Sequence, residues 1–174
     1  LAETPPFDQI VPIRRPTAKA VNPLVAALAY DGLCGFEFAC AAEVFGLPRP
    51  ELQPGWYRFE TCAAQRGTLR AQHGLRVVAD AGLDRLVEAG TVIIPGWKGI
   101  DVPVPPLVLD ALREALARGA RLLSICSGSF VLAATGLLDG RRATTHWRYA
   151  DALQRKYPRI TVDPAVLYVD EGQL

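Results

Sequence analysis

The sequence contains no methionine and no hydrophobic run of membrane-spanning length among its 174 residues. A transmembrane helix needs about 20 consecutive apolar residues, and the start of the chain also lacks the apolar stretch of a secretory signal peptide. We therefore expect a cytoplasmic protein with no membrane partner. Because a chain that begins at Leu1 has no initiator methionine, we expect a segment of a longer protein.

An excess of charge and a cysteine framework are missing as well. The chain has 19 Lys and Arg residues against 18 Asp and Glu residues, a net charge of +1, which argues against binding nucleic acid through bulk charge. The four cysteines have no C-x-x-C spacing (Cys34, Cys40, Cys62, Cys126). This argues against a disulfide framework and a zinc site, and we expect no metal and no cofactor.

The residues that are present fit one domain with a substantial core, because half of them are hydrophobic. Residues 1–23 contain five prolines and are predicted to form an extended or disordered leader. Residues 24–174 alternate between short apolar runs and segments with helical spacing. This alternation predicts an α/β fold, a doubly wound and mostly parallel sheet with helices on both faces.

The predicted strands are apolar or alternating runs. They cover residues 24–30, 56–63, 91–95, 121–125, 160–162 and 166–169. The predicted helices cover residues 36–45, 83–89, 106–118, 127–135 and 147–157. A short hairpin is expected over residues 69–79, around Gly74.

Cys126 is the most informative position, because it falls between the strand predicted over residues 121–125 and the helix over residues 127–135. A nucleophile on a sharp turn from strand to helix is typical of a nucleophile elbow. Since a helix N-terminus stabilises a thiolate, we expect a lowered pKa for Cys126. The alternative is a buried structural cysteine, but the elbow context favours a functional site.

Two titratable residues are candidates to act with Cys126. Glu37 lies on a largely apolar helix after the first strand, where a carboxylate needs a partner or a raised pKa, and Glu43 is the competing acid. His146 can stabilise a thiolate or move its proton, or it can simply cap the helix that follows. His73 is expected to be an exposed turn residue.

Backbone N–H groups complete the candidate site. Gly96 and Trp97 end the strand predicted beside that of Cys126, and with Ser127 they could bind an anion or a carbonyl oxygen of a ligand. The basic residues within 129–157 lie in a stretch of sequence that resembles a helix-turn-helix. We do not expect this segment to read DNA, because its first helix must pack on the sheet.

The run from Ser124 to Trp147, which contains Ser-Ile-Cys-Ser-Gly-Ser-Phe and ends in Thr-Thr-His-Trp, resembles the ThiJ/PfpI members of the class I glutamine amidotransferase-like superfamily. More narrowly, it is similar to the N-terminal domain of AraC-type transcriptional regulators of the FtrA and GlxA kind. Residues 29–32, 43–46, 95–97 and 166–172 match that pattern too, so that the resemblance spans residues 24–174.

The resemblance implies a flavodoxin-like fold with Cys126 at the elbow, Glu37 as its acid partner and His146 near the thiol. It also implies a C-terminal helix-turn-helix domain that binds DNA and is absent from these 174 residues. Ala41 departs from the pattern, because many relatives have proline there, and this bears on the placement of the acid.

Three functions follow from the resemblance. The first and preferred one is a ligand-sensing and dimerisation domain of a transcriptional activator, a homodimer with an unknown small-molecule ligand. The second is a stand-alone enzyme, isonitrile hydratase-like or amidase-like, with Cys126 as nucleophile and Glu37 as general acid/base. The third is oxidative sensing through Cys126.

Overall fold

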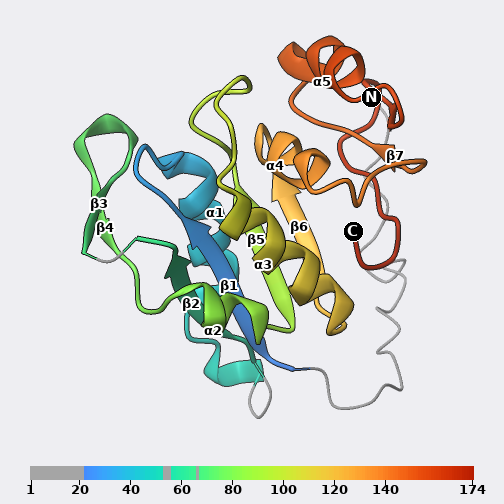
Figure 1. Ribbon diagram of the computed structural model, residues 1–174. Helices are drawn as coiled ribbons and strands as arrows, with labels where there is room; N and C mark the ends of the chain where they lie inside the picture. Colours follow the sequence, from blue (N-terminus) through green and yellow to red (C-terminus); the bar gives the residue numbers. More distant parts are fainter. Residues whose placement is uncertain (1–21, 53–55, 66) are drawn as a thin grey trace, which may run out of the picture.

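The computed structural model describes residues 22–52, 56–65 and 67–174, so the leader predicted over residues 1–23 lies almost wholly outside the described residues. At its centre is a four-stranded parallel sheet in the order β2-β1-β5-β6 (Figure 1). The strands are β1 (Leu24–Ala29), β2 (Arg58–Ala63), β5 (Thr91–Pro95) and β6 (Arg121–Ile125). All four were predicted, each within two residues of its bounds.

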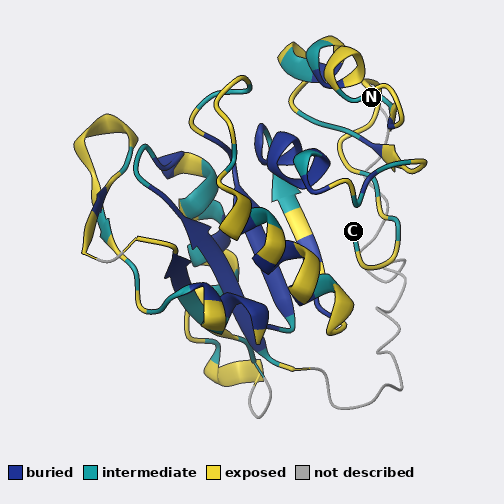
Figure 2. Ribbon diagram, viewed as in Figure 1, coloured by how far each residue is buried: buried dark blue, intermediate teal, exposed yellow. Residues whose placement is uncertain are grey.

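Side chains of the central strand β1 divide the core in two. All six of its residues are buried (Figure 2). Leu24, Ala26 and Leu28 belong to the larger core cluster, whereas Val25 and Ala27 belong to the smaller one on the other face. Strand residues alternate between the faces of a sheet, so a continuous apolar run is what a strand covered on both faces requires.

Helices cover both faces of the sheet. Helix α1 (Gly35–Gly46) contributes Ala41 and Phe38 to the smaller core, and helices α2 (Leu83–Val87), α3 (Pro106–Ala117) and α4 (Gly128–Ala134) contribute to the larger one. The doubly wound, flavodoxin-like α/β prediction is therefore confirmed. Helix α3 has Pro in its first turn and is followed by Gly119 with a φ of 98°, as the usual signals for helix ends predict.

The predicted hairpin is also present. Strands β3 (Thr68–Arg70) and β4 (Arg76–Val78) pair antiparallel across a 3-10 turn, η3 (Gln72–Gly74). His73 lies exposed in that turn with a φ of 61°, as expected for a turn residue. A further 3-10 turn, η2 (Pro50–Leu52), follows α1.

The C-terminal part differs from the predictions. The helix expected over residues 147–157 begins as a 3-10 turn, η4 (Trp147–Tyr149), and continues as α5 (Ala150–Lys156). Strands β7 (Arg142–Ala143) and β8 (Thr161–Val162) form a separate two-residue parallel pair.

The strand predicted over residues 166–169 is wrong. This apolar segment pairs with no strand in the described part of the chain, and Leu167 is 99% exposed. Its neighbourhood is attached by single hydrogen bonds instead, such as that from Leu122 N to Gln173 O at 2.7 Å. β-propensity without a partner strand does not make a strand.

Candidate functional site

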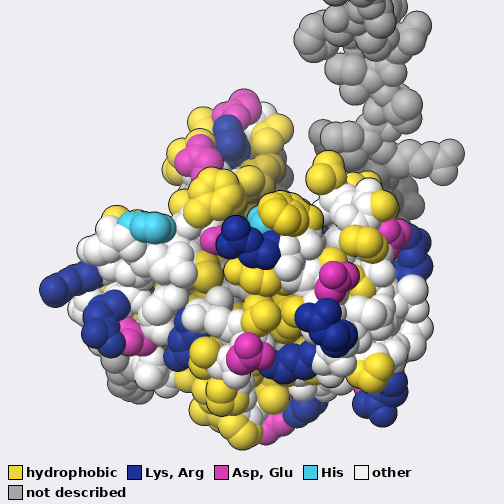
Figure 3. Space-filling model, turned by 90° about the horizontal axis from the view of Figure 1, so that it is seen from above, with side chains coloured by type: hydrophobic (Ala, Val, Ile, Leu, Met, Phe, Trp, Pro, Cys, Tyr) yellow, Lys and Arg dark blue, Asp and Glu magenta, His cyan; other side chains and the backbone are white. Residues whose placement is uncertain are grey.

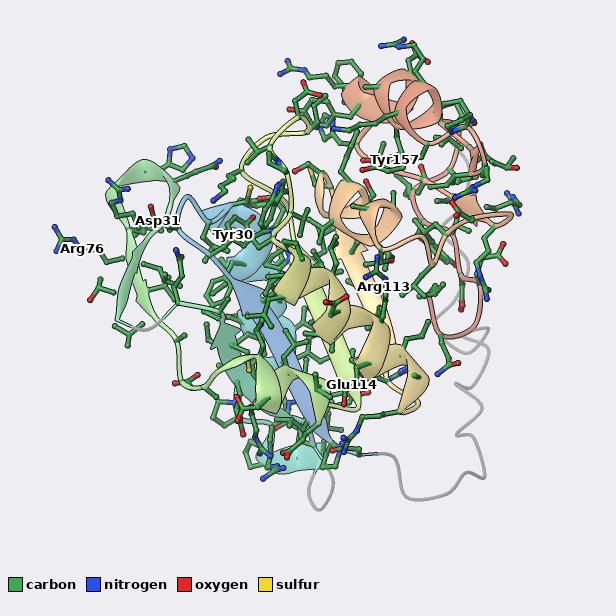
Figure 4. The ribbon with its side chains drawn as sticks, viewed as in Figure 1. Tyr30, Asp31, Arg76, Arg113, Glu114 and Tyr157 are labelled. Atoms are coloured by element: carbon green, nitrogen blue, oxygen red, sulfur yellow. The ribbon has the colours of Figure 1, made fainter. Side chains whose placement is uncertain are left out.

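The candidate site lies where parallel strands end. Because β1, β5 and β6 run in one direction, the residues that follow them meet at one edge of the sheet: Tyr30, Gly96 and Cys126. Figure 3 looks down on this end of the molecule, where hydrophobic side chains are exposed between charged ones. Figure 4 shows Tyr30 at the end of β1 and Tyr157, the residue that follows α5, above α4. Ligands of open α/β sheets bind at such edges.

Cys126 occupies a sharp turn between β6 and α4, with a φ of 55°. This left-handed conformation costs a non-glycine residue roughly 1–2 kcal/mol, so neighbouring contacts must hold it. The Thr145 hydroxyl donates to Cys126 O at 2.9 Å and accepts from the Ser129 hydroxyl at 2.8 Å. The predicted strand–cysteine–helix turn is thus present, and two hydroxyl groups fix its carbonyl.

Glycine is required beside the elbow. A Cβ on Gly128 would overlap the carbonyl oxygen of Ile94 on β5. The first turn of α4 can approach β5 this closely only without a side chain at that position. Gly96 N also donates to Ile125 O at 3.1 Å, which ties the end of β5 to the elbow.

The expected lowering of the Cys126 pKa is wrong. Burial, with the hydrogen bond to the Glu37 carboxylate and its charge, raises the pKa of Cys126 to about 11. A hydrogen bond from the Ser127 N–H acts in the opposite direction, but α4 has only seven residues and does not outweigh burial. At neutral pH a thiol with this pKa is protonated.

The two candidate acids have different surroundings. Glu37 raises the pKa of the thiols of both Cys126 and Cys34. Glu43 lies further along α1, where it lines a separate cavity of about 500 Å³ beside Leu33. Of the two, Glu37 is thus the acid that acts on the elbow thiol, and its catalytic role stays a prediction.

The three expected backbone donors lie at the elbow, but two of them are already engaged. Gly96 N donates to Ile125 O, and Trp97 N donates to the Ser127 hydroxyl at 2.9 Å. The Ser127 N–H points to the Cys126 sulfur. A ligand oxygen could use the first two N–H groups only by displacing these internal partners.

His146 is placed as the cap of η4. Its Nδ1 accepts from Arg148 N at 3.2 Å, and its ring lies against those of Trp147 and Tyr149. It lines the same cavity as Cys126, but its imidazole is committed to the cap. The capping alternative accounts for the observed contacts, and a role in proton transfer stays a prediction.

A cavity of about 910 Å³ opens beside the elbow. Its walls come from Ile125 and Leu123 on β6, from Phe45 at the end of α1, and from residues 164–174. Leu123 is 41% exposed and Trp147 is 74% exposed, so the walls are largely apolar and open to solvent. Mostly apolar pockets with a few polar groups are typical of small-molecule sites.

Sequence reasoning missed three residues of the site. Cys34 and Tyr30 lie beside the elbow, where Tyr30 Oη donates to Pro95 O at 2.8 Å, and Thr145 holds the Cys126 carbonyl. For Cys34 a signal existed, since it precedes Glu37 by three residues and side chains at that spacing share a helix face. Within the described ranges, no three His, Cys, Asp or Glu residues form a metal-binding group, and no helix is long and apolar enough to cross a membrane.

A family model described as the DJ-1/PfpI family matches residues 26–173, a range that contains the whole elbow. The chain belongs to the DJ-1/PfpI family. An uncharacterized protein from the cpoL 5′ region of Streptomyces lividans is 36% identical over 140 residues, which are 77% of this chain and 94% of that protein.

Other members of the DJ-1/PfpI family that match are regulators and an enzyme. The HTH-type transcriptional regulator CdhR of Pseudomonas aeruginosa is 36% identical over 66% of this chain and 34% of its own length. The chain thus spans about a third of that regulator. An isonitrile hydratase of Pseudomonas putida is 43% identical over 36% of this chain and 28% of its own length.

The fold agrees with solved structures of the DJ-1/PfpI family. Drosophila melanogaster DJ-1beta superposes with a TM-score of 0.70 at 20% identity, over 88% of this chain and 80% of that one. At this identity the likeness concerns the fold alone.

Proposed function

We propose that the chain is the ligand-sensing and dimerisation domain of an AraC-type transcriptional regulator, and that a separate helix-turn-helix domain of the complete protein binds DNA. The curated relatives named as HTH-type regulators support this proposal, since the stretch that matches this chain is only 19–34% of their length. The proposal includes a cytoplasmic homodimer.

The sensing role rests on two properties of the elbow: the Cys126 thiol is protonated, and the neighbouring backbone N–H groups already have hydrogen-bond partners. The Cys126 thiol stays protonated against Glu37 at neutral pH, whereas nucleophilic catalysis by cysteine needs the thiolate. The N–H groups of Gly96 and Trp97, which would stabilise an oxyanion, are bound within the protein. Such a site is better suited to holding a small molecule than to turning it over.

The segment over residues 129–157 is unsuited to reading DNA, which favours a separate binding domain. Phe130 and Val131 of α4 are buried in the larger core, so α4 cannot enter a DNA groove. The first helix of a helix-turn-helix must be free to cross the DNA backbone, and α4 is packed in the core instead. This favours a separate DNA-binding domain in the complete protein.

A binding experiment on the full-length gene product tests the proposal. Fluorescence anisotropy with DNA from upstream of its own gene is expected to show binding that scrambled DNA does not compete away. The Cys126→Ala variant should bind that DNA as well as the wild type does. A full-length product that binds no DNA specifically would refute the proposal.

The second candidate is a cysteine-dependent isonitrile hydratase, which the match to the Pseudomonas putida enzyme favours. In that case Cys126 would be the nucleophile, with Glu37 taking its proton and returning it. Steady conversion of cyclohexyl isonitrile and water to the N-substituted formamide, abolished in Cys126→Ala but not in Glu43→Gln, would establish it. No conversion by the wild type would dismiss it.

A further inference from the structure

A second thiol, that of Cys34, lies near the elbow. It is buried and precedes the first residue of α1, but its side chain does not cap that helix. Its sulfur lies 3.5 Å from Trp97 O and accepts a long contact from Gln72 Nε2 at 3.8 Å. These are weak interactions for sulfur, so close packing rather than hydrogen bonding holds the Cys34 side chain.

Cys34 packs against Gly96, next to the elbow. A Cβ built on Gly96 would lie 2.6 Å from the Cys34 sulfur and 3.6 Å from the hydroxyl of Ser127, the residue next to Cys126. The absence of a side chain at Gly96 is therefore what leaves room for the Cys34 sulfur beside the elbow.

The helix α1 brings the two thiols to a common partner. Cys34 is the N-cap residue of α1 and Glu37 lies in the first turn of that helix, and Glu37 raises the pKa of both thiols. A charge on Cys34 also acts on Cys126. Two sulfurs and one carboxylate thus converge where β1, β5 and β6 end.

We propose that Cys34 is the resolving thiol of Cys126, and that a hydroperoxide converts the pair into an intramolecular disulfide. The site becomes a two-cysteine redox site rather than a single oxidisable thiol. The hydroperoxide is the oxidant, and the chain supplies both electrons through its two sulfurs.

The first step forms an S–O bond and breaks the O–O bond of the peroxide. The Cys126 sulfur attacks one oxygen, its proton passes through the Glu37 carboxylate to the departing oxygen, and sulfenic acid and water (or an alcohol) result. In the second step the Cys34 sulfur attacks the sulfenic sulfur. The S–O bond breaks, an S–S bond forms, and the Cys34 proton leaves with the hydroxide as water.

Strand pairing places the contact partner of Cys34 beside Cys126. The Cys34 sulfur packs against Gly96, and because Pro95 pairs with Ile125, the residues that follow them, Gly96 and Cys126, are neighbours. The backbone at Cys34 is held, since Leu33 N donates to Arg70 O and Phe38 N donates to Cys34 O. The bond must therefore close by rotation of the cysteine side chains, to the Cα separation of about 4.4–6.8 Å that a disulfide needs.

The disulfide would also alter the sensor. It removes the hydrogen bond between the Cys126 thiol and Glu37 and ties the start of α1 to the elbow. This regulatory consequence rests on the proposed function, whereas the bond itself is a chemical property of the purified chain. The two proposals can fail separately. The DNA-binding experiment above tests whether the protein is a regulator, and the mass spectrometry below tests whether the disulfide forms.

Mass spectrometry of the purified chain after hydrogen peroxide treatment tests the inference. The Cys40→Ser background is used because Cys40 shares a tryptic peptide with Cys34, and the reaction is run near pH 9 so that some thiolate is present. We expect a loss of about 2 Da and a linked peptide pair joining Cys34 to Cys126 that dithiothreitol separates.

The control is Cys34→Ser in the same background, which keeps a good N-cap residue and should fold. In this variant Cys126 is expected to gain about 32 Da, because without a resolving thiol it proceeds to sulfinic acid. Equal sulfinic acid formation with and without Cys34, and no linked peptide, would overturn the proposal. A Cys126 that peroxide leaves unmodified would overturn it as well.

Discussion

The reactivity of Cys126 toward iodoacetamide gives the sharpest check on the electrostatics of the elbow. Burial and Glu37 raise its pKa to about 11, against 9.0 for an ordinary thiol. At any pH well below 9 the thiolate fraction is then roughly 100-fold smaller. A more basic thiolate is intrinsically more nucleophilic by roughly tenfold over this interval. We therefore expect alkylation about ten times slower than for an unperturbed cysteine.

The pH dependence separates this cause from simple shielding. The alkylation rate of Cys126, followed on its own tryptic peptide, should rise about tenfold per pH unit from pH 7 to 10 and level off only near 11. A shielded thiol of ordinary pKa would level off near pH 9. In Glu37→Gln the plateau should move to lower pH but stay above 9, because burial is the larger cause.

Glu43→Gln is the matched control, since Glu43 lies on the same helix but lines the other cavity. Its alkylation profile should coincide with that of the wild type. A plateau of the wild-type rate below pH 8 would refute the reasoning, because it would mean that the thiolate is stabilised as the helix terminus alone predicts.

Three further outcomes are expected from urea unfolding. Gly128→Ala should lose about 3 kcal/mol or more of unfolding free energy, since its Cβ meets the Ile94 carbonyl. Thr145→Val should lose about 1–2 kcal/mol, since it leaves the Cys126 carbonyl without that donor. Stability should fall as pH rises from 9 to about 12, because the pKa of Cys126 is raised to about 11 and that of Cys62 to about 12: both thiols ionise first in the unfolded chain.

Each of these has an outcome that would contradict it. Gly128→Ala with an unchanged urea midpoint would mean that α4 does not approach β5 as described. Thr145→Val should cost more than Thr144→Val, whose hydroxyl makes only a 3.5 Å contact with Val166 O. A Cys62→Val variant should lose less stability than the wild type above pH 10, and an unchanged profile would argue against the Cys62 contribution.

Local patterns were sufficient to predict the sheet. Buried parallel strands need continuous apolar runs, and the runs at residues 24–30 and 91–95 fit no other element as well as a buried strand. The run at residues 166–169 looked similar, but whether it becomes a strand depends on a partner with free hydrogen-bonding groups. That partner is a property of the whole fold, which the sequence of the segment does not contain.

The same distinction applies to the site. The turn at Cys126 follows from local spacing and was predicted, and the role of Glu37 as its acid partner stays a prediction. The sign of the shift in the thiol pKa was predicted wrongly, because burial and the charge of Glu37 outweigh the effect of the helix behind the sulfur. Cys34 was missed because its importance arises from Gly96, which is 62 residues away and leaves the space that the sulfur occupies.

The central claim is that Cys126 and Glu37 serve a sensor rather than a catalyst. The most direct measurement is transcription from the promoter of its own gene, with the full-length protein supplied as wild type, Cys126→Ala, Glu37→Gln or Glu43→Gln. The account predicts that the first two variants change the level or inducibility of transcription while promoter DNA stays bound, and that Glu43→Gln behaves as wild type. Identical transcription in all four, together with Cys126-dependent turnover of an isonitrile, would contradict it.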